Sequence, residues 1–240
     1  LKLTKQLFEQ DPSSGFADYY ERTVYNHILA SQEPDHGMMA YFMPMKPGHF
    51  KVYSDPVNSF WCCVGTGIEN HARYGEAIYF RSDDSKVLYV NLFIPSTLNW
   101  DEKGVALSQE TDFPVSDKST LRFICAKPVN LTLKIRKPFW TKNPRVAVNG
   151  KPVNAQLGAD GYLAVERTWK GGDVVEVRLP MSLRTEILPN SPSIQAVMYG
   201  PLLMVGALGT DGMDKTPDIK RDQDPYGSLP AMDTGVLVTS

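Results

Sequence analysis

The spacing of apolar residues divides the chain into two regions. Within residues 1–31 apolar side chains recur every three to four positions, which is typical of helices packed on one side. A turn-forming Asp-Pro-Ser-Ser-Gly run at 11–15 separates the first segment from the second, 16–31. The pattern therefore predicts two helices. The second helix presents one apolar face, formed by Ala17, Tyr20, Val24 and Ile28.

Beyond residue 77 the apolar residues alternate with polar ones, as in half-buried strands. Strand-like segments cover 86–96, 121–126, 131–138, 145–153, 162–169, 173–181 and 193–206. Asn149-Gly150 predicts a tight hairpin, and Lys170–Asp173 predicts another turn. This many short strands favours an antiparallel β-sandwich. Residues 207–232, rich in Asp, Gly and Pro, are predicted to form a long loop.

Composition narrows the function classes. The 240 residues carry a net charge of −2, so the basic excess typical of nucleic-acid binding is absent. No apolar run approaches the roughly 18 residues that a membrane span needs. The chain begins without Met and ends on a strand-like Gly-Val-Leu-Val-Thr-Ser, so we expect a fragment of a longer protein. Cys125 alternates with Leu121 and Phe123, and is expected to be a small buried residue.

Two positions are unusual for a globular core. Glu21 lies among the apolar residues of its predicted helix, where a carboxylate requires a partner or a role. Cys62 and Cys63 stand side by side before a short helix predicted at 66–75. The free N–H groups at a helix start can lower a thiol pKa and favour a metal-bound or nucleophilic thiolate. The pair can equally be two ordinary buried residues, and it offers at most two of the four ligands that zinc requires.

Nearby residues add weaker candidates. Glu69, His71 and Glu76 are candidate acid–base groups, although residues of these types are more often solvated helix residues. Phe60 and Trp61 are expected in the core beside the cysteines.

The segment FWCCVGTGIENHARYGEAIYF, residues 60–80, resembles the double-cysteine motif of glycoside hydrolase families 127 and 146. These are the β-L-arabinofuranosidase-like enzymes. The segments 1–8, 17–31 and 38–45 are similar to neighbouring parts of their catalytic domain, and 196–206 resembles one strand of their sandwich. The resemblance is specific over residues 1–80. Beyond residue 80 it consists of the general architecture and that one strand.

This resemblance implies a mixed fold. Residues 1–80 would form the C-terminal part of an (α/α)6 catalytic barrel that includes the double-cysteine motif, and 81–240 a β-sandwich domain that is truncated. Such enzymes hold one zinc through a Glu and three Cys. By position Cys62 matches the nucleophile, which also contacts zinc, and Cys63 matches a second ligand. Glu21 and Tyr41 match residues that contact the sugar. The remaining ligands and the acid/base Glu are expected upstream of residue 1.

The full-length protein is thus expected to be a zinc-dependent, retaining glycoside hydrolase. It would cleave β-L-arabinofuranosides in plant-derived oligo- or polysaccharides, and the family resemblance implies a periplasmic or secreted enzyme. The fragment alone is expected to be inactive, to hold zinc weakly, and to cover its helices with a new partner such as a second copy. Two alternatives remain open: a non-catalytic carbohydrate-binding or structural β-sandwich module, and a thiol hydrolase using Cys62 with His71.

Overall fold

The computed structural model describes residues 1–43 and 51–207, which form two compact units. Unit 1 contains Leu1–Val24 and Tyr74–Met204, and unit 2 begins at Tyr25 and continues to Arg73. The strand predicted at 235–240 and nearly all of the predicted loop lie outside the described residues.

Unit 1 begins with the two predicted helices, α1 (Lys2–Gln10) and α2 (Ser14–Thr23). Ser13 caps α2 by accepting a hydrogen bond from the Gly15 amide. The prediction of one regular helix over 16–31 was wrong in its second half, because the chain changes to a π-helical turn and then a 3-10 turn, η1 (Val24–Ile28) and η2 (Leu29–Ser31). The Thr23 hydroxyl donates to the Tyr19 carbonyl at 2.8 Å, a back-bond that bends helices.

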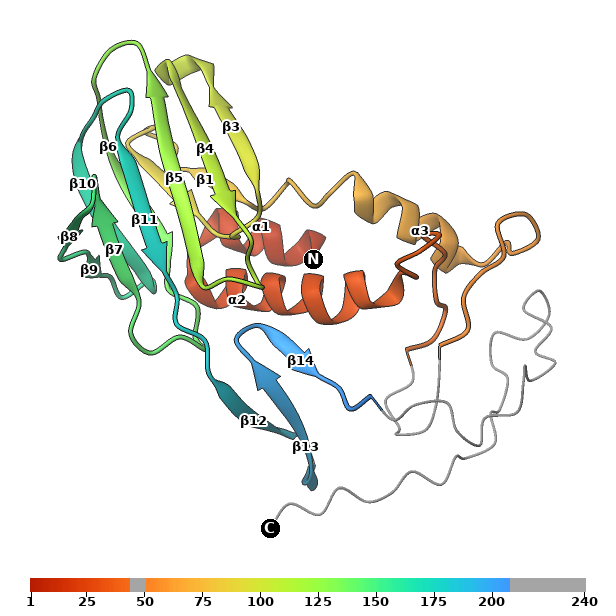
Figure 1. The fold of residues 1–240 in the computed structure, drawn as a ribbon. Coiled ribbons are helices and arrows are strands. Elements are labelled where there is room, and N and C mark those ends of the chain that lie inside the picture. Colours follow the sequence, from red (N-terminus) through yellow and green to blue (C-terminus); the bar gives the residue numbers. More distant parts are fainter. Residues whose placement is uncertain (44–50, 208–240) are drawn as a thin grey trace. The chain divides into compact units, whose positions relative to one another are not determined.

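The strands form three sheets, with the orders β1-β2-β6-β10-β9, β3-β4-β5-β11-β7-β8 and β12-β13-β14 (Figure 1). Their bounds are β1 Tyr79–Arg81, β2 Val87–Val90, β3 Ser96–Trp100, β4 Val105–Thr111, β5 Lys118–Cys125, β6 Val129–Arg136, β7 Arg145–Val148, β8 Lys151–Val153, β9 Gln156–Leu157, β10 Tyr162–Trp169, β11 Val174–Arg178, β12 Leu183–Leu188, β13 Ser191–Tyr199 and β14 Leu202–Met204. A short 3-10 turn, η3 (Asp101–Lys103), joins β3 to β4.

The first two sheets face each other across an apolar core. Phe123 of β5 stacks on Trp169 of β10 with ring centroids 4.2 Å apart, and the Trp169 indole donates to the Leu131 carbonyl. All strand pairs are antiparallel, as predicted, except β2 with β6, which run parallel. The predicted hairpin at Asn149-Gly150 is confirmed, since both residues have the positive φ that such a turn requires.

Cys125 was expected to be buried, and this is only half correct. It follows Leu121 and Phe123 on the same face, but it is the last residue of β5 and is half-buried because the strand ends there. Its sulfur lies 3.9 Å from the Trp169 carbonyl oxygen.

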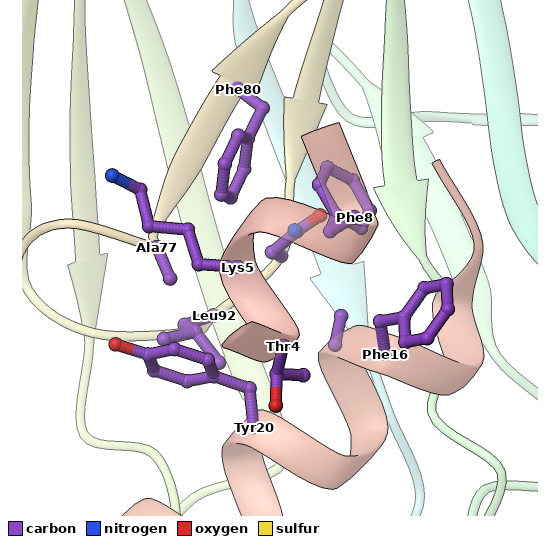
Figure 2. Close-up of a pocket in the computed structure, with 10 residues that line it drawn as sticks. Thr4, Lys5, Phe8, Phe16, Tyr20, Ala77, Phe80 and Leu92 are labelled. Atoms are coloured by element: carbon purple, nitrogen blue, oxygen red, sulfur yellow. The ribbon is translucent and has the colours of Figure 1, made fainter. Parts of the chain in front are cut away.

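The sandwich covers much of the apolar face of α1 and α2. Phe8 packs on Phe80 with centroids 4.5 Å apart, and Tyr20 is buried with Leu92 and Ile78. Figure 2 shows Phe8, Tyr20, Phe80 and Leu92 around a small pocket between the helices and the strands. Its volume of about 10 Å³ is close to the minimum for a single water. In unit 1 the sandwich strands thus cover part of the apolar surface of these helices, while Leu3, Leu7 and Tyr19 stay exposed. The expected association with a second copy of the chain stays a prediction.

A buried charge cluster ties α2 to the sandwich. Arg136, the last residue of β6, is fully buried and donates to Asp18 through Nη1 and to Glu21 through Nη2. Its Nε donates to the Asn91 carbonyl at 2.6 Å. The second carboxylate oxygen of Glu21 accepts from the Trp140 indole at 2.9 Å. These contacts define the Arg136 cluster: Asp18, Glu21, Asn91, Arg136 and Trp140.

The charges of the Arg136 cluster depend on one another. Burial raises the pKa of both Asp18 and Glu21, although Arg136 acts in the opposite direction. Desolvation lowers the pKa of Arg136, but the charges of Glu21 and Asp18 outweigh it and raise that pKa above its ordinary value. The guanidinium therefore stays charged, and it forms an ion pair with each of the two acids.

Arg136→Met should strongly destabilise unit 1, because it leaves two buried carboxyl groups without their cation. We expect a loss of about 3–5 kcal/mol in the free energy of unfolding. Urea unfolding followed by circular dichroism would measure it. The matched control is Arg122→Met on β5, which removes an exposed ion pair with Glu110 and should change stability little. Equal losses in both variants would contradict the anchoring role of Arg136.

Candidate functional site

The cysteine pair lies in unit 2, at the start of α3 (Cys62–His71). The helix was predicted to begin at residue 66 but begins four residues earlier, so both cysteines belong to its first turn. The boundaries were expected at Gly65 and Gly75, yet Gly65 lies inside the helix, which ends at His71. Trp61, with an extended backbone, precedes the helix as its N-cap residue.

The turn that precedes α3 is fixed by side-chain hydrogen bonds. The Asp55 carboxylate accepts from the amides of Val57 and Asn58 at 2.8 and 3.0 Å. The Ser59 hydroxyl accepts from the Asp55 amide at 2.7 Å. This compact turn fixes the direction in which the chain enters Trp61 and the cysteines.

The two thiols lie close together without forming a disulfide. Their Sγ atoms are 3.8 Å apart, with Cys62 exposed and Cys63 half-buried. Two sulfurs bound to one tetrahedral zinc at about 2.3 Å each would be separated by about 3.8 Å. The pair therefore has the spacing of two ligands on one metal ion.

The surroundings of the pair do not favour a thiolate by themselves. Burial, followed by the neighbouring Cys62 thiol, raises the pKa of Cys63 above its usual value. The expectation that the helix start lowers the thiol pKa is thus wrong for Cys63. Across residues 1–43 and 51–207 no three His, Cys, Asp or Glu side chains gather as a metal site would require. Any metal at the pair would need ligands from elsewhere.

Tyr41 is the predicted sugar-binding residue that the structure brings near the cysteines. The rings of Tyr41 and Trp61 pack edge to face with centroids 6.2 Å apart. Trp61 directly precedes Cys62 in the chain. Phe60, expected in the core, is instead 93% exposed. An exposed aromatic residue therefore precedes Cys62 by two positions in the chain.

The acid–base candidates near α3 have other partners. His71 ends the helix, and nine residues of rise place its backbone about 13 Å from that of Cys62. The His71 ring instead lies 3.1 Å from the Gln32 side-chain nitrogen. Glu69 pairs with Arg73, and Glu76 of unit 1 with Lys5. The Cys62–His71 dyad of the thiol-hydrolase alternative is thus not formed.

Glu21 lies in unit 1, and its carboxylate is 1% exposed. Both of its oxygens already accept hydrogen bonds, from Arg136 and Trp140. Sequence reasoning recognised that Glu21 requires a partner, but it missed these two, which are 115 and 119 residues away. Arg136 ends an ordinary strand pattern, so no local signal marks it.

Solved structures that resemble the chain are glycoside hydrolases. They include a GH127 β-L-arabinofuranosidase from Geobacillus stearothermophilus T6, a protein described only as a glycoside hydrolase, and a GH127 β-arabinofuranosidase. Each is 26% identical, with a TM-score of 0.71 over 83% of this chain. The chain spans only 34–35% of these structures, about a third of their length.

Two domain profiles of one family match consecutive parts of the sequence. Residues 1–76 match the catalytic domain of GH127 β-L-arabinofuranosidases, and residues 87–181 match the GH127 middle domain. Together they cover well over half of the chain, which belongs to the GH127 family. A search of the curated proteins gave no match. Among the described residues, no helix has the length and apolar character needed to cross a membrane.

Proposed function

We propose that this chain is part of a retaining glycoside hydrolase that cleaves β-L-arabinofuranosides, with zinc-bound Cys62 as its nucleophile. The observation that carries the proposal is the thiol pair, 3.8 Å apart in the first turn of α3. It lies in the segment that matches the GH127 catalytic domain. The proposed substrates are arabinofuranosyl groups of plant-derived oligo- or polysaccharides.

The proposed chemistry is a double displacement. The Cys62 sulfur attacks the anomeric carbon, the bond to the leaving oxygen breaks, and that oxygen takes a proton from an acid. Water then attacks the same carbon and loses a proton to the conjugate base, which returns Cys62 as thiolate and retains the configuration. We assign the acid/base to a Glu outside this chain, by family resemblance.

Zinc would be held in part by Cys62 and Cys63, whose sulfur spacing fits two corners of a tetrahedron. When bound it supplies positive charge that keeps thiols deprotonated at neutral pH. Burial raises the pKa of Cys63 when no cation is present, so a nearby positive charge is needed to hold this thiol as a thiolate. The other two ligands, a Glu and a Cys, are assigned outside this chain by the same resemblance.

The remaining roles follow the same proposal. Tyr41, held against Trp61, would present its ring or hydroxyl to the sugar beside Cys62. Glu21 would contribute to sugar binding while its carboxylate keeps its hydrogen bonds from Arg136 and Trp140. We also propose that residues 1–80 complete an (α/α)6 barrel, and that residues from 81 onward form the sandwich domain of the enzyme.

Zinc content tests the metal site. The full-length protein should bind one zinc, and Cys63→Ser should lower its occupancy because a hydroxyl replaces a soft thiolate ligand. Elemental analysis of metal-replete protein measures this. The matched control is Cys125→Ser, which changes a half-buried thiol of the sandwich and should leave zinc in place. Negligible zinc in the wild type would contradict the metal site and favour the non-catalytic sandwich alternative.

Turnover of an aryl β-L-arabinofuranoside tests the nucleophile. Cys62→Ser should abolish turnover in the full-length enzyme while thermal unfolding stays nearly unchanged, since Cys62 is exposed. Mass spectrometry should detect a covalent glycosyl adduct on the wild type only. Activity within about tenfold of the wild type would reject Cys62, because tenfold corresponds to only about 1.4 kcal/mol of barrier.

Glu21→Gln tests whether this carboxylate does more than anchor α2. The amide would set its NH₂ group against a donor, Arg136 or Trp140, so some loss of stability is expected. Trp140→Phe is the control, since it removes one hydrogen bond from Glu21 but keeps the charge. A sugar-binding role requires a higher KM for Glu21→Gln than for Trp140→Phe, at a temperature where both are folded. Equal kinetics would leave Glu21 with anchoring alone.

A further inference from the structure

We infer that Gly67 is a positioning residue for the cysteine pair, because its missing side chain lets α3 lie directly against Met39. This inference rests on the proposed function, since it takes Cys62 and Tyr41 as the parts of the site that need alignment. Met39 is two residues before Tyr41, and Gly67 is five residues after Cys62. One contact in unit 2 therefore joins the two chain segments that carry the proposed chemistry.

The contact leaves no room for a larger residue. A Cβ atom on Gly67 would lie 2.6 Å from Met39 Cγ and 2.8 Å from Sδ, and real Cβ atoms essentially never approach closer than 3.0 Å. The Cγ atom is only two bonds from the Met39 backbone, so rotation at the end of the side chain does not remove the overlap. Gly67 is itself buried in α3.

Met39 cannot easily withdraw. Its side chain is buried, with 5% exposed. Its amide donates to the Ser54 hydroxyl at 3.1 Å, and its carbonyl accepts from the Ser54 amide at 2.9 Å. The neighbouring Ala40 pairs with Tyr53 in an isolated bridge. An added methyl group on α3 would thus move the helix rather than the Met39 backbone.

Contacts at both ends of α3 depend on the spacing at Gly67. At the start, Trp61 meets Tyr41 edge to face, and at the end His71 lies 3.1 Å from Gln32. Both partners belong to the segment that contains Met39. A helix displaced at its middle would change the distance from Cys62 to Tyr41, and misplacement of about 1 Å can lower a rate by about 100-fold.

Gly65 provides a matched control on the same helix. A Cβ atom there would have no neighbour within 4 Å. Alanine is preferred over glycine inside helices, so Gly65→Ala should keep or raise stability. The same preference applies to Gly67→Ala, and any loss in that variant therefore comes from the contact with Met39.

The experiment compares four variants of the full-length protein: Gly67→Ala, Gly65→Ala, Met39→Ala and the double variant Gly67→Ala/Met39→Ala. The readouts are zinc content, kcat and KM on an aryl β-L-arabinofuranoside, and hydrogen exchange of the peptide covering residues 62–71. Gly67→Ala should lower kcat/KM by about 10- to 100-fold and speed exchange in α3. Gly65→Ala should match the wild type in all three readouts.

The double variant decides whether the contact is the cause. Because Met39→Ala removes the overlapping atoms, it should restore slow exchange in α3 and most of the kcat/KM lost in Gly67→Ala. Wild-type behaviour of Gly67→Ala, or no rescue in the double variant, would overturn the inference. A wild type without zinc or turnover would instead reject the proposed function, while hydrogen exchange would still test the Gly67–Met39 contact.

Discussion

The guanidinium of Arg136 is the charge on which the arrangement of unit 1 depends. It has no exposed surface, and each of its nitrogens donates to an acceptor from a different position: Asp18, Glu21 or the Asn91 carbonyl. A buried cation is tolerated only when its hydrogen bonds are complete, and here two of the acceptors lie on one helix. The orientation of α2 on the sandwich is therefore set by electrostatics as well as by apolar packing. The chain reaches unit 2 directly from the end of this helix.

The parts of the fold that depend on neighbouring residues were predictable from sequence. Alternation identified the strands, and Asn149-Gly150 identified a turn because few other residues accept its backbone angles. The errors arose where side-chain contacts are invisible to the apolar pattern. After Thr23, whose hydroxyl donates to the Tyr19 carbonyl, the chain changes to π-helical and 3-10 turns. Helix α3 runs through two glycines, one of which packs against Met39.

The candidate site was predictable only in part, for the same reason. The thiol pair is visible because the two residues are neighbours in the chain, and its sulfur spacing follows from the first turn of α3. The odd position of Glu21 in an apolar face indicated an unusual environment, but the sequence could not distinguish a sugar from an ion pair. Its partners Arg136 and Trp140 become neighbours only when the sandwich folds against α2.

The Arg136 cluster also constrains how this family can exchange its domains. Asp18 and Glu21 lie in the segment that matches the catalytic domain, whereas Arg136 and Trp140 lie in the segment that matches the middle domain. A recombinant that joins these segments from two relatives inherits a sound interface only if both parents carry the same charges at these positions. Otherwise it buries acids without a cation, or a cation without acids. In this chain the two matched segments are thus tied together by buried charges, although their sequences match separate profiles.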